Sequence, residues 1–292
     1  MNFFRIISFL FFTLAFGVNP AVSQNRNSFD RNIVQDVGLS FGTAYYLGDI
    51  NPRKHFGTRL HTAFGGNYRV NFDRRWALKF SLLQGRVEAY DADSDDPWQQ
   101  NRNLSFKNDF TEGSLVFELN FWEYEIGQGK KYSPVAPYFF VGLAYYKMKP
   151  QGLFNSTWYE LQPLGTEGQG ISINSQRYKT TGISVPFGAG VKLSVLKIIG
   201  FSLEWGLRKT WTDHFDDVSG VYPNEVVLED ENGDLAVYFS DQSLSSQQSN
   251  GTNNGVQRGD PGRKDWYAFA HATLSFRLTK QKGSCWGGKI MR

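Results

Sequence analysis

The chain has 292 residues and is almost balanced in charge, with 31 lysines and arginines against 28 aspartates and glutamates. A formal net charge of +3 is too small to indicate a nucleic-acid-binding protein, and a single cysteine excludes an internal disulfide framework. Aromatic residues make up 16% of the chain although its mean hydropathy is only −0.42. This combination is typical of transmembrane β-strands, in which an apolar face alternates with a polar one.

The first 23 residues have the parts of a secretory signal peptide. Arg5 supplies the positive charge, an apolar run covers residues 6–16, and residues 21–23 resemble a cleavage site. The alternative is an uncleaved membrane anchor, but the apolar run is short for a membrane-spanning helix. We expect 1–23 to be a signal peptide, 24–278 to be one exported domain and 279–292 to be a basic tail.

Eight segments in the exported domain have the period of two that predicts a β-strand. The clearest is 198–211, where an apolar row that includes Trp205 alternates with a polar row that includes Glu204 and Arg208. In chain order, the expected strands are 34–46, 58–70, 76–90, 110–124, 135–147, 183–195, 198–211 and 265–278.

The connections between these strands alternate between long and short. The long ones are 47–57, 91–108, 148–180 and 212–264, and the short ones lie near 71–75, 125–134 and 196–197. Long outer loops and short periplasmic turns are typical of an outer-membrane barrel, and an even strand count places both chain ends in the periplasm. The sequence therefore predicts an all-β, eight-stranded antiparallel transmembrane barrel in the outer membrane of a Gram-negative bacterium. The middle of the last loop, rich in Ser, Gln, Asn and Gly, is expected to be mobile.

The alternative to a membrane barrel is a soluble eight-stranded barrel of the lipocalin type. It does not explain why nearly every strand carries charges on the row opposite its apolar face. In a membrane barrel these side chains point into the lumen, where they must pair because isolated buried charges are costly. We therefore expect a lumen filled by ion pairs, not a conducting pore. The charged residues assigned to this row are Arg59, His61, Arg69, Lys79, Glu112, Glu118, Lys192, Glu204, Arg208, His271 and Arg277.

The start of the last long loop holds the clearest candidates for chemistry. Asp213, Asp216 and Asp217 offer the hard oxygen ligands that calcium and magnesium prefer, but the spacing of a calcium loop is absent. A turn in which these carboxylates accept backbone N–H bonds is the favoured interpretation. His214 and Ser219 with one of the aspartates suggest a hydrolytic triad, yet no G-x-S-x-G nucleophile motif is present. We expect neither an enzyme nor a bound cofactor.

Three motifs at the edges of the loops resemble those of the PorG family, small outer-membrane barrels of the type IX secretion system. They are AYYLGDINP at 44–52, RKTWTDHFDDVSGVYP at 208–223 and RGDPGRKDWYAFAHATLSF at 258–276, and the aromatic strand at 137–146 agrees with them. The Ser/Gln/Asn-rich insert near 240–257 departs from the family pattern. The loop residues that belong to these motifs are Asp49, Asn51, Asp213, Asp216 and Asp217.

This resemblance implies an OmpA-like barrel that meets a ring of lipoprotein and other type IX subunits on its periplasmic side. The implied role is the assembly or anchoring of a secretion and gliding machine, with lipid and lipopolysaccharide around the barrel. The alternative is a free-standing barrel that stabilises the membrane or acts as a narrow porin, since a fold alone does not fix function.

The tail supplies the predicted partner contacts, Lys282, Cys285 and Trp286. It is basic, and nearby lysines favour the reactive thiolate of an unpaired cysteine. We expect it to dock on a periplasmic ring subunit, with a disulfide from Cys285 as one form of that contact. Attraction of the basic tail to anionic lipid headgroups is the alternative.

Overall fold

The computed structural model describes residues 33–56, 60–128, 131–171, 176–248 and 251–278. The expected signal peptide, Arg59 and the tail contacts Lys282, Cys285 and Trp286 lie outside these ranges.

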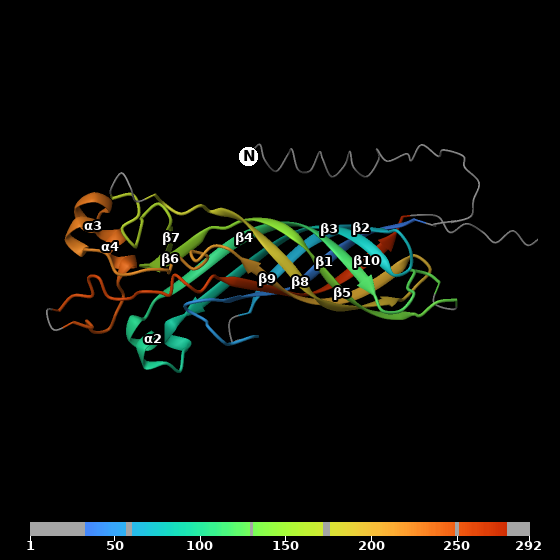
Figure 1. The fold of residues 1–292 in the computed structure, drawn as a ribbon, viewed down its shortest axis with the longest axis horizontal. Helices are drawn as coiled ribbons and strands as arrows, with labels where there is room; N and C mark the ends of the chain where they lie inside the picture. The colour runs from blue at the N-terminus through green and yellow to red at the C-terminus, as the bar shows by residue number, and fades with distance from the viewer. Residues whose placement is uncertain (1–32, 57–59, 129–130, 172–175, 249–250, 279–292) are drawn as a thin grey trace, which may run out of the picture. The chain divides into compact units, whose positions relative to one another are not determined.

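The described chain forms a closed antiparallel β-barrel of eight strands (Figure 1). Each strand pairs with its neighbour in the chain, and the last strand pairs with the first from Leu47↔Trp266 to Asp36↔Arg277. All eight expected strands are confirmed. They are β1 (Val34–Leu47), β2 (His61–Asn71), β3 (Trp76–Tyr90), β4 (Ser105–Asn120), β5 (Val135–Lys147), β8 (Thr181–Ser194), β9 (Ile199–Thr210) and β10 (Trp266–Arg277).

The fourth expected strand was placed too late in the chain. Residues 105–108, predicted as loop, belong to β4, and Ser105 pairs with Tyr90 at the far end of β3. Residues 121–124 leave the sheet, and the amide of Tyr124 donates to the carbonyl of Arg74 in the neighbouring turn. The reason is the length of β3, whose backbone groups require a partner over its whole course.

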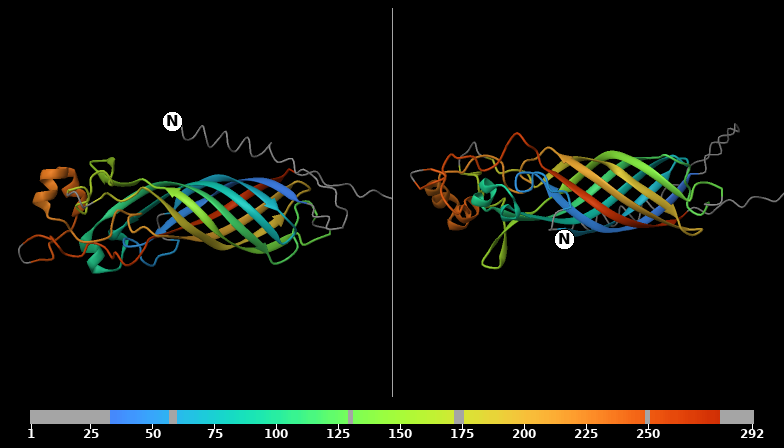
Figure 2. Two further views of the ribbon diagram at one scale, coloured as in Figure 1. Left: turned by 45° about the horizontal axis from the view of Figure 1, so that its top comes forward. Right: turned by 90° about the horizontal axis from the view of Figure 1, so that it is seen from below.

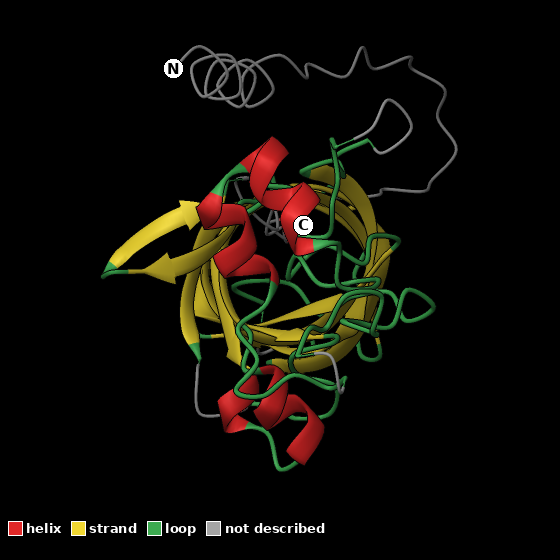
Figure 3. Ribbon diagram, turned by 90° about the vertical axis from the view of Figure 1, so that its left-hand side faces the viewer, coloured by secondary structure: helices red, strands yellow, loops and turns green. Residues whose placement is uncertain are grey.

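The long loops contain secondary structure that the sequence did not reveal. They hold η1 (Asp91–Asp93), α2 (Pro97–Arg102), the hairpin of β6 (Pro150–Phe154) and β7 (Thr157–Glu160), α3 (Glu225–Asn232) and α4 (Asp234–Ser240). Figure 3 looks onto this end of the barrel, where the helices gather and the β6–β7 hairpin extends beyond the wall. No helix within the described ranges is both long and apolar enough to span a membrane.

Local sequence explains where these short helices begin. The side chain of Asp96 accepts a hydrogen bond from the amide of Trp98 at 2.9 Å, and Pro97 occupies the first turn of α2. Asn224 caps α3 in the same way. Helices as short as α2 and α3 cannot be predicted from a hydrophobic period.

The segment expected to be mobile makes ordered contacts. Asn253 donates to Asp241 at 2.7 Å, and Gln257 forms a bridge with Val221.

The outer wall of the barrel is apolar, as the alternation predicted. Trp205 is 38% exposed, whereas its neighbour Glu204 faces the lumen and is 6% exposed. Leu39, Phe139 and Leu203 are also exposed on this wall. The barrel strands that form the wall are seen from two sides in Figure 2. A continuous apolar wall around a charged interior is the arrangement that a bilayer requires. It rules out the soluble alternative and agrees with the expected outer-membrane location.

The two ends of the barrel differ as expected. The described chain starts and finishes at the end with the short turns, because Val34 pairs with Asn71 and Asp36 with Arg277. Exposed Trp76 lies near this end, and exposed Trp211 lies at the other, where β9 enters its long loop. Tryptophan at both borders of an apolar belt is typical of membrane interfaces.

A pair of leucine substitutions tests whether the wall faces lipid. Leu203→Arg, near the middle of β9, should cost about 2–4 kcal/mol of folding free energy in phospholipid vesicles, because the charge must enter the apolar belt. Leu244→Arg is the control, since Leu244 is 73% exposed in an outer loop against 53% for Leu203. Equal effects of the two changes in a denaturant titration would contradict the assignment.

Candidate functional site

Ion pairs fill the lumen at the level nearest the short turns, and Glu118 is their centre. The Arg69 Nε atom lies 2.9 Å from the Glu118 carboxylate, Lys192 Nζ lies 2.5 Å from it and Lys79 Nζ lies 3.2 Å from it. Arg69 also pairs with Asp36 at 3.1 Å. All five side chains are buried. One carboxylate thus binds three cations, each of which comes from a different strand.

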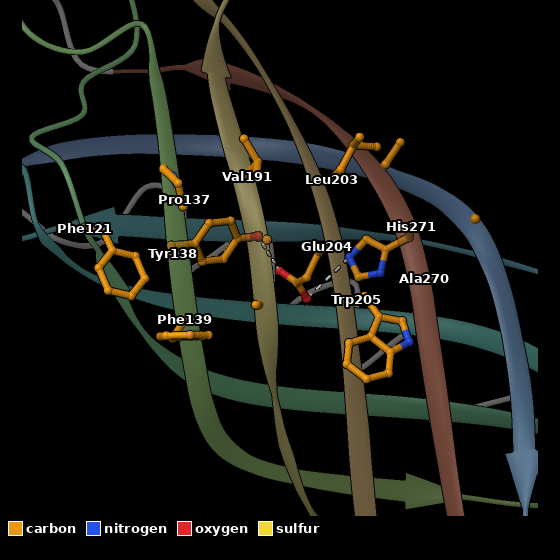
Figure 4. Close-up of a pocket in the computed structure, with 14 residues that line it drawn as sticks. Phe121, Pro137, Tyr138, Phe139, Val191, Leu203, Glu204, Trp205, Ala270 and His271 are labelled. Carbon is orange, nitrogen blue, oxygen red and sulfur yellow. Dashed lines mark hydrogen bonds and ion pairs between the residues drawn. The ribbon is translucent and has the colours of Figure 1, made fainter. Parts of the chain in front are cut away.

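The next level of the lumen is organised by Glu204, one of the residues that the sequence placed inside. Tyr138 donates a hydrogen bond to Glu204 at 2.7 Å, Lys79 forms an ion pair with it, and His271 Nε2 lies 3.6 Å from its other oxygen. Figure 4 shows Tyr138 and His271 pointing toward Glu204 from opposite sides.

The third level lies closer to the long loops. Arg208 Nε lies 3.3 Å from Glu112, and the Tyr267 hydroxyl donates to the same carboxylate at 2.8 Å. Ser184 and Tyr267 share a hydrogen bond of 2.9 Å. The guanidinium of Arg208 also lies over the ring of Phe269, 4.8 Å from its centroid.

These three levels balance one another in charge. Four carboxylates, Asp36, Glu112, Glu118 and Glu204, face four cations, Arg69, Lys79, Lys192 and Arg208. Because an unpaired buried charge costs several kcal/mol, near-equal numbers are what a narrow lumen requires. The predicted ion pairs inside the lumen are confirmed. Two other predicted lumen residues lie at its ends, with His61 3.3 Å from Glu88 and Arg277 2.9 Å from Glu125.

The described part of the turn after β4, residues 121–128 and 131–134, closes the periplasmic end of the barrel. Tyr124 and Ile126 are buried beneath the lumen, and the Tyr124 hydroxyl donates to the carbonyl of Leu193 at 3.1 Å. Gly127 has a φ of +85°, and a Cβ there would lie 2.0 Å from the carbonyl oxygen of Lys197. The turn therefore packs directly against the turn of residues 195–198, at a position that only glycine can occupy.

Residues 212–219, here named the outer plug, close the opposite end. Phe215 is fully buried, and its ring lies 5.1 Å from that of Tyr267 and 5.3 Å from that of Phe110. Its amide donates to Asp265 at 2.9 Å, and its carbonyl accepts a hydrogen bond from Asn108 at 2.6 Å. The plug therefore fills the outer mouth of the lumen with an aromatic side chain.

The three aspartates of the outer plug accept hydrogen bonds mainly from hydroxyl groups. Asp216 accepts from Tyr46, Asp217 accepts from Tyr178 and Thr166 at 2.5 Å each, and Asp213 accepts from Ser219 at 2.7 Å. One backbone bond of the expected kind is present, from Val218 to Asp216 at 3.0 Å. The described residues hold no group of three His, Cys, Asp or Glu side chains placed for a metal ion.

Burial changes the ionisation of these side chains. It raises the pKa of Asp213 and of Asp217 to about 6 and that of Asp216 well above its usual range. Burial lowers the pKa of His214, whose ring stacks on Tyr178 at 4.6 Å. Because the Ser219 hydroxyl donates to Asp213, the residues considered for a triad are not in the order serine, histidine, aspartate.

The three motifs that carry the family resemblance meet in one network around the outer plug. Asp49 accepts a hydrogen bond from the amide of Asp260 at 2.8 Å, and Asn51 donates to the carbonyl of Tyr46 at 2.7 Å. The Tyr46 hydroxyl in turn contacts Asp216 and lies 2.9 Å from Asp265. Asp49, Asn51 and Asp216 therefore act together in positioning the outer loops on the barrel.

Two buried arginines that the sequence did not single out support the same network. Arg102 binds Asp91 through two hydrogen bonds of 2.7 Å and donates to the carbonyl of Arg258 at 2.6 Å. Arg258 pairs with Glu167 at 2.8 Å and donates to the carbonyl of Asp217 at 2.6 Å. In the sequence these arginines look like ordinary loop cations, because nothing local marks them as buried.

The contribution of Glu118 to the free energy of unfolding can be measured by removing its charge. Glu118→Gln removes the carboxylate that three buried cations share. The free energy of unfolding should therefore fall by about 3–5 kcal/mol. Asp109→Asn is the matched control, because its pair with Arg86 is 34–46% exposed and should contribute about 1 kcal/mol or less. The measurement is a denaturant titration in detergent micelles, and similar losses for both variants would show that the lumen network is not the main support.

Comparison with known proteins gives limited similarity. No curated protein matches the chain. Among solved structures, the attachment invasion locus protein Ail of Yersinia pestis shares 10% identity with a TM-score of 0.39, covering 84% of this chain and 99% of that one. The N-terminal barrel of Pseudomonas aeruginosa OprF shares 12% identity with a TM-score of 0.33, covering 82% and 97%. Neisserial surface protein A shares 10% with a TM-score of 0.34, covering 83% and 96%.

One family model matches most of the chain, at residues 21–232. The match covers the barrel strands from β1 to β9, the outer plug and α3, and it ends before β10. The family is described only as a domain of unknown function, so the match assigns no partner and leaves the resemblance to type IX secretion barrels as a hypothesis. The chain belongs to the DUF6089 family.

Proposed function

We propose that this chain is a non-enzymatic outer-membrane barrel that assembles with, or anchors, a periplasmic ring of the type IX secretion and gliding machinery. In this proposal lipid and lipopolysaccharide surround its apolar wall, and a lipid-anchored ring subunit binds its periplasmic end. The resemblance of its loop motifs to those of the PorG family supports the assignment to the type IX secretion machinery. The geometry supports a role in binding, since both ends of the lumen are closed.

The observation that carries the proposal is an apolar turn at the periplasmic end. Val195, Leu196 and Ile198 are each 59% exposed, and the amide of Leu196 donates to the carbonyl of Ile199 to close the turn at 3.0 Å. Turns that face water are usually built from Gly, Asn, Asp, Ser and Pro. Exposed aliphatic side chains at such a position suit a protein surface that covers them.

The neighbouring surface extends this patch. Trp122 is exposed in the adjacent periplasmic turn, and that turn is held against residues 195–198 by the hydrogen bond from the amide of Gly127 to Ser194 at 2.8 Å. Aromatic residues are enriched at protein interfaces. The tail residues Lys282, Cys285 and Trp286 follow the last strand and remain proposed contacts of the same partner.

The proposal predicts that charges in the apolar turn separate the barrel from its partner. Leu196→Glu combined with Ile198→Glu should abolish crosslinking of the ring lipoprotein to the barrel in native membranes, and type IX cargo should stay in the cell. Leu244→Glu places one such charge on a leucine at the outer end, which is 73% exposed against 59% for Leu196, and should leave crosslinking intact. Retained heat-modifiable migration on gels confirms that each variant is folded.

Other results would favour a free-standing barrel. If the wild-type chain crosslinks to no ring subunit, and if its deletion weakens the envelope without affecting secretion, the proposal is wrong. If the double variant keeps its partner, the apolar turn is not the binding surface and the observation that carries the proposal is lost.

A further inference from the structure

We propose that the outer plug is a proton-controlled closure, in which buried carboxyl groups hold Phe215 in the outer mouth of the barrel while they are protonated and release it when they ionise.

The hydroxyl of Tyr46 is the first observation behind this proposal. It lies between two buried carboxyl groups, in contact with Asp216 and 2.9 Å from Asp265. A phenol has one proton to donate. The Tyr46 hydroxyl can donate a hydrogen bond to one of the two carboxylates only. The other carboxyl group must then be protonated and donate a hydrogen bond to the phenol oxygen. The geometry therefore fits a state in which this pair carries one shared proton.

The absence of neutralising cations is the second observation. Among the described residues, none forms an ion pair with Asp216, Asp217 or Asp265, although these three side chains are at most 1% exposed. Arg102 is bound by Asp91 and by backbone carbonyls. A buried carboxylate without a cation is costly, and protonation removes that cost.

The charged and titratable groups that face this cluster come from every loop around it. Asp49 and Asp213 add negative charge, Arg102 adds positive charge near Asp216, and Arg258 and Glu167 face Asp217 with opposite signs. The remaining groups are Tyr46 beside Asp216 and Asp265, Tyr146 beside Asp265, Tyr178 beside Asp217, Lys264 beside Asp213, and His214, whose ring stacks on Tyr178 at 4.6 Å.

The direction of the pH effect follows from these surroundings. Burial raises the pKa of Asp217 to about 6 and raises those of Asp216 and Asp265 well above their usual range. A carboxyl whose pKa is higher in the folded state favours folding when protonated, so its support is complete below the unfolded pKa near 4 and is lost as the pH rises through the folded value. The plug should therefore be tight in mild acid and loosen from about pH 6 upward.

The backbone of the plug is consistent with release as a unit. Phe215 is bracketed by these carboxyl groups, since its amide donates to Asp265 and Asp216 and Asp217 follow it directly. Asp217 has a φ of +66°, in the left-handed region that costs energy for residues with a side chain. Its hydrogen bonds to Tyr178 and Thr166 offset that strain in the closed state.

The test uses a nitroxide spin label at Val221→Cys, which is 52% exposed just beyond the plug. The full chain also carries Cys285→Ser, is refolded into phospholipid bilayers, and its spectra are recorded from about pH 5 to about pH 9. The label should be immobilised at the acid end and become mobile as the pH rises. Asp216→Asn, which mimics the protonated carboxyl, should reduce the pH-dependent change by at least about half. Asp95→Asn, at a side chain that is 93% exposed, should not alter it.

Three outcomes would overturn the proposal. The first is a label whose mobility does not depend on pH in the otherwise unchanged chain. The second is an Asp216→Asn variant that responds to pH like the Asp95→Asn control although its strands are intact by circular dichroism. The third is full restoration of the immobilised spectrum at alkaline pH by calcium, since a bound cation would then replace the proton as the element that holds the plug. Tyr46→Phe provides a second variant, which should loosen the plug even in mild acid.

Discussion

The structure depends on charge neutrality inside a narrow barrel. Glu118 binds Arg69, Lys79 and Lys192, and the remaining carboxylates of the lumen take up the rest of the positive charge. These cations and carboxylates come from strands far apart in the chain, so their pairing fixes how the strands face one another across the lumen. Outside, the wall requires only apolar surface. Inside, each charge is tolerable only because its partner is present.

The same constraint governs the two ends of the barrel but has different solutions. At the periplasmic end, Tyr124 and Ile126 cover the lumen with apolar surface, and Arg277 pairs with Glu125 at the rim. At the outer end, carboxyl groups exceed the available cations, and hydroxyl groups of Tyr46 and Tyr178 take the place of counter-ions. In our proposal, protons on the carboxyl groups supply neutrality at the outer end, which makes this end sensitive to pH. In the lumen network, cations supply it instead.

The sequence was informative wherever one rule acts along a whole strand. Alternation in β9 placed Trp205 outside and Glu204 inside because a strand has only two faces, and the same reasoning located all eight strands. It did not identify Tyr138 and Tyr267 as partners of lumen carboxylates, because tyrosine fits either face. The beginning of β4 was missed because it depends on the length of β3.

The site was less predictable than the fold for a physical reason. Asp49, Asp216 and Asp265 are distant in the chain, and only barrel closure brings their loops together around Tyr46. The burial of Arg102 and Arg258 likewise follows from the packing of several loops and has no local signature. The resemblance of the motifs singled out Asp49, Asn51, Asp213, Asp216 and Asp217. It did not indicate that they contact one another.

The proposed role in binding requires a lumen that is closed by its own side chains. Electrical recording from the purified full chain in planar bilayers tests it most directly. We expect no stable conductance at acid or alkaline pH, because the ion pairs centred on Glu118 and Glu204 block the lumen even when the outer plug is released. A stable, reproducible open-channel conductance in the unmodified chain would contradict the claim.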